Sequence, residues 1–97
     1  MQVQVWTAVH EFGAGISTFV ALSEAAAKQW LYDIVKEYWS EVAGLVDNTG
    51  ELDEVPETVP DDQDKAIDLY FYNHPEGERG DIDTQTLEIP VGSIGYD

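Results

Sequence analysis

The chain contains no cysteine, which excludes disulfide bonds, thiolate metal sites and a cysteine nucleophile. Basic residues are also scarce, because 4 Lys and Arg stand against 20 Asp and Glu and leave a formal net charge of −16 at pH 7. Such a charge repels phosphate and anionic lipid, so we expect no direct binding to nucleic acid or to membranes. No apolar run approaches the roughly 20 residues that cross a bilayer, and residues 1–6 lack the basic side chains that open a secretory signal. A cytoplasmic protein is therefore expected.

The residues that are present favour a folded domain. Hydrophobic residues make up 43% of the chain and aromatic residues 11%, which is too rich in core-forming side chains for a disordered segment. A length of 97 residues fits one compact unit, and we expect residues 1–97 to form a single domain.

Alternating side chains predict two strands near the amino terminus. Apolar or β-branched residues occupy every second position over residues 3–9 and again over residues 16–22, and the glycines between them suit a reversal of the chain. We therefore expect a β-hairpin over residues 3–22. Alternation returns over residues 81–91, which predicts a third strand beside the hairpin.

Two helices are expected between the second and third strands. Ser23 is suited to cap a helix, and apolar residues at three- and four-residue intervals, with Trp30 among those expected in the core, extend it over residues 24–43. Residues 47–60 lose this periodicity and are expected to form an acidic surface loop. Asp61 then caps a second helix over residues 62–73. The predicted fold class is α+β in the order β-β-α-α-β, with a three-stranded antiparallel sheet and two helices packed on one face.

The acidic residues supply the candidate binding site. Residues 1–46 hold five acids and two bases, whereas residues 47–97 hold fifteen acids and two bases. On the expected helices the carboxylates recur about every 5 to 6 Å, which is unfavourable by about a few tenths of a kcal/mol for each like-charged pair. Nucleic-acid backbones present similar lines of anionic oxygens, so these stripes are suited to a Lys- and Arg-rich groove built for phosphate. A surface that only keeps the protein soluble is the competing interpretation.

The candidate partner-binding residues lie on the two expected helices and on the loop between them, where the loop acids are expected to be flexible additions. On the first helix they are Asp33, Glu37 and Glu41. Around the second helix they are Asp61, Asp62, Asp64 and Asp68. On the loop they are Glu51, Asp53, Glu54 and Glu57.

Metal and catalytic sites are not expected. Residues 47–54 are rich in oxygen ligands, but Gly50 falls at the fourth position of this segment, whereas an EF-hand loop has its glycine at the sixth. His10 and His74 are the only histidines, and neither is expected to have a neighbouring ligand suited to zinc. The sequence shows no nucleophile elbow and no glycine-rich phosphate loop. We expect no metal, no cofactor and no enzymatic activity.

Several segments carry a resemblance to known proteins. They are WLYDIVKEYW (residues 30–39), PDDQD (60–64) leading into AIDLYF (66–71), and the closing DID (81–83). In composition and order the chain resembles small β-β-α-α-β proteins of bacterial phages and mobile elements, and among these it is similar to the acidic anti-CRISPR and anti-restriction inhibitors. That resemblance implies a protein that acts in the cytoplasm of a bacterial host and blocks host defence by occupying a DNA-binding surface. These families share no universal motif, so no functional residue carries over from them.

Two functional hypotheses follow. In the first, the protein is a non-enzymatic inhibitor that mimics DNA and blocks the nucleic-acid-binding groove of a host-defence complex, in the first place a Cas effector subunit. In the second, it is a structural or adaptor module of a phage or plasmid that binds its partner through an apolar patch around Tyr32, Trp39 or Phe71, and its charge serves solubility only. Ionic strength separates the two, because charge-driven complexes weaken steeply with salt.

Overall fold

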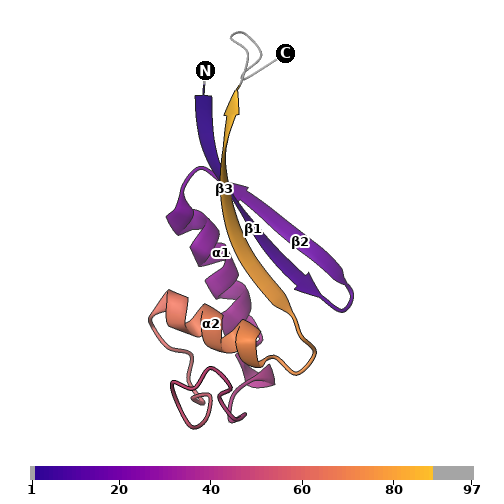
Figure 1. The fold of residues 1–97 in the computed structure, drawn as a ribbon, viewed down its shortest axis with the longest axis vertical. Coiled ribbons are helices and arrows are strands. Elements are labelled where there is room, and N and C mark those ends of the chain that lie inside the picture. Colours follow the sequence, from indigo (N-terminus) through magenta and orange to yellow (C-terminus); the bar gives the residue numbers. More distant parts are fainter. Residues whose placement is uncertain (1, 89–97) are drawn as a thin grey trace.

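The computed structural model describes residues 2–88 and confirms the expected α+β order (Figure 1). The elements are β1 (Gln2–Phe12), β2 (Gly15–Ala21), α1 (Glu24–Glu37), the 3₁₀ helix η1 (Trp39–Glu41), α2 (Gln63–Asn73) and β3 (Arg79–Glu88). The three strands form one antiparallel sheet in the order β2-β1-β3, so the last strand pairs beside the hairpin as predicted.

The central strand, β1, is also the longest of the three. Its residues 6–12 pair with β2, whereas its residues 2–11 pair with β3. The ladder between β1 and β3 therefore continues past the end of β2, and Figure 1 shows these two strands extending together beyond the helices.

Both helices lie on the same face of the sheet, as expected (Figure 1). Successive side chains of a strand point to opposite faces, and the inward-facing Ala8 and Ala21 meet Ala27 and Leu31 of α1 in a buried cluster. These small strand residues allow α1 to approach the sheet closely.

A second buried cluster lies between the two helices and the loop that joins them. Its members are Val35, Trp39, Val42, Val55, Ala66, Leu69 and Tyr70. β3 comes close to α2 at Gly80, where an added Cβ would collide with the ring of Phe71. A side chain at this position would force Phe71 to move, so only glycine allows the observed approach.

The first helix ends earlier than expected. α1 stops at Glu37 instead of continuing to residue 43, because Tyr38 leaves the helical conformation and η1 follows. The turn carries Trp39 into the core, where it is 4% exposed and its Nε1–H donates to the backbone oxygen of Pro56 at 2.8 Å. Trp30, which was expected in the core, is half-buried and stacks on Phe19. The buried tryptophan is thus Trp39.

The other boundaries differ by smaller amounts. α2 is capped by Asp62, whose side chain accepts a hydrogen bond from the backbone N–H of Lys65 at 3.2 Å, and not by Asp61 as predicted. β3 begins at Arg79, ahead of the expected residue 81, and its predicted continuation over residues 89–91 lies outside the described residues. No helix within residues 2–88 combines the length and the hydrophobicity that a membrane span requires.

Replacing Trp39 by alanine is expected to destabilise the protein by about 3 to 5 kcal/mol, because a large buried ring is lost and the carbonyl of Pro56 loses its donor. Trp30→Ala should be clearly less destabilising, since Trp30 is only half-buried. Urea unfolding of the two variants measures both free energies. A Trp30 variant that is destabilised as much as the Trp39 variant would contradict this placement of the two rings.

Candidate functional site

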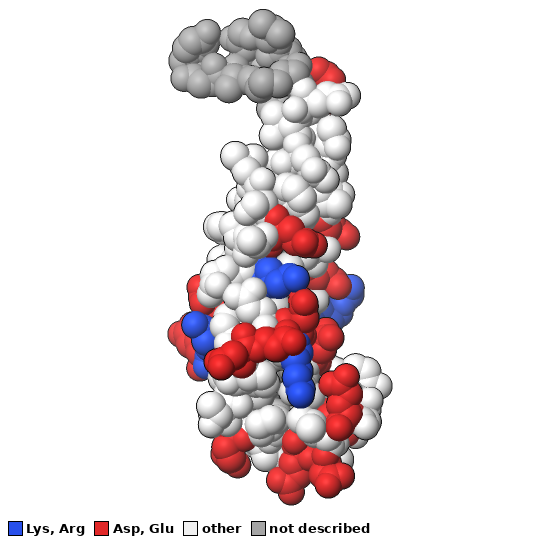
Figure 2. Space-filling view, turned by 90° about the vertical axis from the view of Figure 1, so that its left-hand side faces the viewer, with Lys and Arg blue, Asp and Glu red and all other residues white. Residues whose placement is uncertain are grey.

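Most acidic residues lie on the surface. Within residues 2–88 all but three are exposed, and the exceptions are Glu11, Asp47 and Glu78. On the face shown in Figure 2, Asp and Glu side chains gather over the part of the molecule that carries the helices and the loop, while the protruding strands are mostly uncharged. The negative surface therefore belongs to the helical end of the molecule.

The acids predicted on the first helix do not form one continuous stripe. Asp33 and Glu37 are exposed on α1, but Glu41 belongs to η1, beyond the end of that helix. The carboxylate of Glu41 accepts a hydrogen bond from Nε2 of His74 at 2.6 Å. Asp33 forms an ion pair with Lys36 at 3.4 Å. Of the three carboxylates, only that of Glu37 has no hydrogen bond or ion pair within the described chain.

The acids around α2 also differ from one another. Asp61 precedes the helix and Asp62 caps it, so neither belongs to a stripe along the helix. Asp64 pairs with Nζ of Lys28 at 2.9 Å, and its hydrogen bond and charge raise the pKa of Lys28. Asp68 is exposed one turn further along. The carboxylates of Asp61 and Asp68 make no internal contact within residues 2–88 and are free to meet a partner.

The loop acids are exposed as predicted, and backbone hydrogen bonds link parts of the loop that carries them. The exposed loop acids are Glu51, Asp53, Glu54 and Glu57. A β-bridge joins Val46 to Glu54, and the backbone N–H of Val55 donates to the oxygen of Leu45 at 2.8 Å. The backbone that carries Glu51, Asp53 and Glu54 is therefore closed by these contacts, and Glu57 lies beyond them.

Asp47 organises the loop from inside. Its carboxylate accepts hydrogen bonds from the backbone N–H groups of Thr49 and Leu52, both at 2.9 Å, and from the side-chain amide of Asn73 at 3.0 Å. The side-chain oxygen of Asn73 in turn accepts from the backbone N–H of Asn48 at 2.8 Å. These contacts anchor the loop to the last residue of α2.

The hydrogen bonds change the acidity of Asp47. Burial acts to raise the pKa of this carboxyl, but the hydrogen bonds from Asn73, Thr49 and Leu52 stabilise the ionised form and lower the pKa to about 2. These donors occupy the oxygens of the Asp47 carboxylate, which would have to coordinate the ion in a calcium-binding loop. Residues 47–54 are accordingly a hydrogen-bonded turn.

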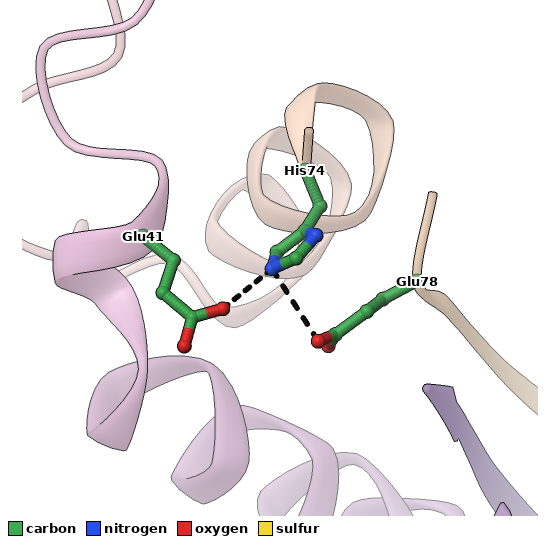
Figure 3. Close-up of side chains that lie close together, drawn as sticks. All are labelled: Glu41, His74 and Glu78. Atoms are coloured by element: carbon green, nitrogen blue, oxygen red, sulfur yellow. Dashed lines mark hydrogen bonds and ion pairs between the residues drawn. The ribbon is translucent and has the colours of Figure 1, made fainter. Parts of the chain in front are cut away.

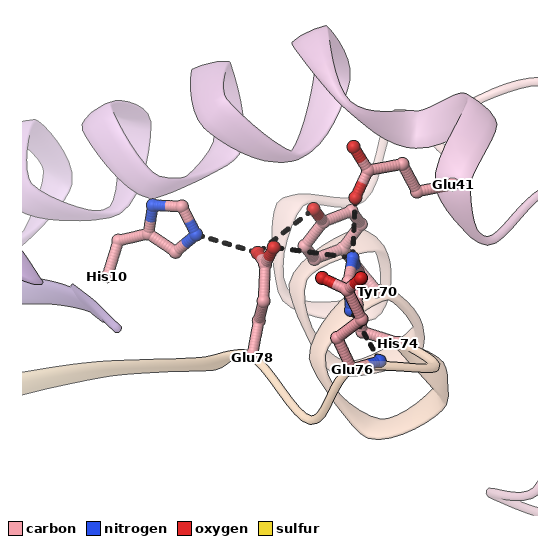
Figure 4. Close-up of polar contacts among 6 residues, drawn as sticks. All are labelled: His10, Glu41, Tyr70, His74, Glu76 and Glu78. Atoms are coloured by element: carbon pink, nitrogen blue, oxygen red, sulfur yellow. Dashed lines mark hydrogen bonds and ion pairs between the residues drawn. The ribbon is translucent and has the colours of Figure 1, made fainter. Parts of the chain in front are cut away.

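Glu78 is the centre of a second polar network (Figure 4). Its side chain is 12% exposed, and its Oε1 accepts hydrogen bonds from Nε2 of His10 at 2.8 Å and from the hydroxyl of Tyr70 at 3.2 Å. Its Oε2 lies 3.4 Å from Nε2 of His74, which also donates to Glu41 (Figure 3). The network therefore joins β1, α2, η1 and the segment that leads into β3.

The contacts fix where the protons of this network lie. The backbone N–H of Glu76 donates to Nδ1 of His74 at 3.1 Å, so the neutral ring carries its proton on Nε2, which faces Glu41. Burial, followed by the negative charge of Glu78, raises the pKa of the Tyr70 hydroxyl far above its ordinary value. Tyr70 therefore remains a donor to Glu78.

The network also brings possible metal ligands together. Ligand atoms of Glu41, His74 and Glu78 all lie within 4.8 Å of one another (Figure 3). They do not fit a metal ion as arranged, because a metal on Nε2 of His74 would require the proton on Nδ1, where Glu76 already donates. Sequence reasoning missed this group, and the expectation that His74 has no suitable neighbour is wrong. The four-residue spacing from His74 to Glu78 was the available signal.

A groove of about 480 Å³ beside α2 brings some of the predicted acids together. Glu51 of the loop and Asp68 of α2 line it, and Asp81 adds a carboxylate from β3. Arg79 also lines the groove, but its guanidinium pairs with Asp81 at 3.3 Å. The groove thus presents carboxylates from separate parts of the chain.

Comparisons of the chain with protein-family models, with curated proteins and with solved structures find no match. The acidic surface, the groove and the Glu78 network are therefore the features of the molecule that bear on its function.

Protonation of Asp47 is expected to destabilise the fold in acid. Its folded pKa of about 2 lies below the value of about 3.9 for an unfolded Asp, so its contribution to stability is present above about pH 4 and is lost as the pH falls towards 2. Asp47→Asn removes this titration. Urea unfolding at about pH 6 and pH 2 should show a difference between parent and variant that shrinks in acid. A difference that stays constant would contradict the lowered pKa.

Proposed function

We propose that the protein is a non-enzymatic inhibitor that binds the Lys- and Arg-rich nucleic-acid groove of another protein and takes the place of the nucleic acid. The observation that carries the proposal is the convergence of carboxylates from the loop, α2 and β3 on one groove within a strongly acidic surface. Bases neutralise only a small part of this surface, because 4 Lys and Arg stand against 20 Asp and Glu. Lys28, Lys36 and Arg79 pair with Asp64, Asp33 and Asp81, whereas Glu51 and Asp68 in the groove have no such partner within residues 2–88. A groove built to bind phosphate is complementary in charge to such a surface.

The anchored loop supports the same proposal. Side chains on a surface that is ordered before binding lose less conformational entropy when a partner arrives. The clustered carboxylates repel one another, and in a complex their attraction to the positive charges of the partner offsets this repulsion. A surface that served solubility alone would gain nothing from holding its acids in place.

The target that we propose is a host-defence complex in the bacterial cytoplasm, in the first place a Cas effector. Such effectors hold nucleic acid in a positively charged channel and use Arg side chains to read a short duplex flank. A protein with a net charge of −16 is suited to occupy that channel. The choice of target follows the resemblance in composition and element order to anti-CRISPR and anti-restriction inhibitors, and the acidic groove supports a basic partner.

An adaptor that binds through an apolar surface is the second candidate. Of the residues expected to form its patch, Trp39 is buried, whereas Tyr32 and Phe71 are half-buried against the core cluster and expose only part of their rings. Apolar side chains with exposures of 62%, 62% and 75% lie instead on β2 and just after it, and these are Ile16, Val20 and Leu22. A complex formed there would be nearly insensitive to salt.

Displacement of labelled duplex DNA from purified Cas effectors and restriction enzymes tests the proposal. The protein should displace the duplex, and its affinity should fall by roughly 10- to 100-fold between about 50 and 200 mM salt. Glu51→Lys combined with Asp68→Lys should weaken displacement by at least about tenfold, because both exposed carboxylates line the groove.

Glu24→Lys combined with Asp83→Lys is the matched control, since it changes the net charge equally at exposed positions outside the groove. This variant should displace DNA nearly as well as the parent, and thermal unfolding checks that both double variants fold. Equal displacement by the two double variants would contradict the proposal. If the parent displaces DNA from none of the complexes, the proposal is also contradicted, and the β2 surface is favoured as the binding site.

A further inference from the structure

A second hollow lies beneath α1, and Glu78 lines both this hollow and the groove beside α2. Its volume is about 370 Å³, near the lower end of the range of about 300 to 1,000 Å³ for ligand-binding clefts. It lies between α1 and the β1–β2 hairpin. The lining side chains that matter here are Phe12, Trp30, Glu37, Tyr38, Glu41 and Glu78.

The hollow is strongly negative. Glu37 is the last residue of α1, Glu41 lies on η1 and Glu78 precedes β3, so the carboxylates come from different elements. The carboxyl end of α1 adds partial negative charge, and none of the described lining residues is Lys or Arg. Internal donors satisfy only part of these oxygens: His74 bonds Oε1 of Glu41, whereas no hydrogen bond or ion pair within residues 2–88 involves Oε2 of Glu41 or the Glu37 carboxylate.

Three aromatic rings line the hollow beside these carboxylates, and His10, Ser17 and Ile34 complete the lining. Trp30 is held by stacking on Phe19, with centroids 5.6 Å apart and an interplanar angle of 8°. Phe12 stacks on His10 with centroids 4.8 Å apart, and Tyr38 is 42% exposed. The faces of aromatic rings attract cations, and a planar guanidinium stacks on them.

We propose that this hollow receives an arginine side chain of the basic partner. A guanidinium has five N–H donors in one plane and can bridge carboxylates from separate elements, while its flat face packs against an aromatic ring. A lysine ammonium is a compact charge that uses this geometry less well. The inference rests on the proposed function for the source of the arginine, because a phosphate-binding groove is rich in that residue. Glu37 and Glu41 thereby act as a pair, although they do not share one helix.

Titration of the full-length chain with Nα-acetyl-arginine amide, followed by amide and indole NMR signals, tests the inference. We expect saturable shifts at the Trp30 indole and at the backbone amides of Phe12 and Tyr38. The citrulline analogue has nearly the same shape without the charge and should cause no such shifts. The lysine analogue should bind at least about threefold more weakly, because an ammonium cannot form the planar fork.

Glu37→Gln should weaken binding of the arginine amide about tenfold, because a charge-assisted hydrogen bond is lost at an exposed position that the fold does not depend on. Asp33→Asn, one turn earlier on α1 and outside the hollow, is the matched control and should bind like the parent. Equal binding of the arginine and citrulline probes, or of the arginine and lysine probes, would overturn the inference. So would an unaffected Glu37→Gln variant, or shifts spread over the loop and α2.

The inference and the proposed function fail separately. If the arginine amide does not bind but the protein still displaces DNA, the arginine pocket is wrong and the inhibitor remains supported by its groove. If the amide binds in the hollow but DNA is displaced from none of the complexes, the proposed function is wrong and the hollow stands as a guanidinium site.

Discussion

The buried carboxylate of Glu78 is the contact on which the rest of the structure depends. A carboxylate with 12% side-chain exposure destabilises a fold unless donors face it, and here His10 and Tyr70 donate to it while Nε2 of His74 lies 3.4 Å away (Figure 4). These residues belong to β1, to α2 and to the cap of α2, and His74 extends the link to Glu41 on η1. One side chain thus joins the sheet to the helical layer, and its loss would leave His10 and Tyr70 without this acceptor.

The carboxyl end of α2 gives the acidic surface its fixed support. Asn73, the last residue of α2, anchors the loop through Asp47, and the next residue, His74, belongs to the Glu78 network. Glu78 itself lies between the two hollows and lines both. The carboxylates that meet a partner are therefore placed by hydrogen bonds made within the protein, so a basic partner can form ion pairs without first ordering the surface.

Local patterns predict the strands, the β1–β2 hairpin and both helices, because alternation and helical spacing are properties of neighbouring residues. The break after α1 is not predictable in this way, since the apolar spacing continues through Val42 and only the docking of Trp39 on Pro56 shows where the helix ends. The Glu78 network is missed for the same reason, because His10 and Glu41 reach it from distant parts of the chain. The acids can be recognised as exposed one by one, but their convergence on two hollows depends on these long-range contacts.

Amide hydrogen exchange of the Glu78→Gln variant tests the central claim most directly, namely that this carboxylate holds the layers together. Gln keeps the shape of the side chain but removes the charge and introduces N–H donors among the donors that now face Glu78. Exchange should become faster in the last turn of α2, in η1 and in the first residues of β3, while rates stay close to those of the parent where residues 2–5 of β1 pair with β3. Unchanged exchange around His74, or faster exchange spread evenly over residues 2–88, would contradict the account.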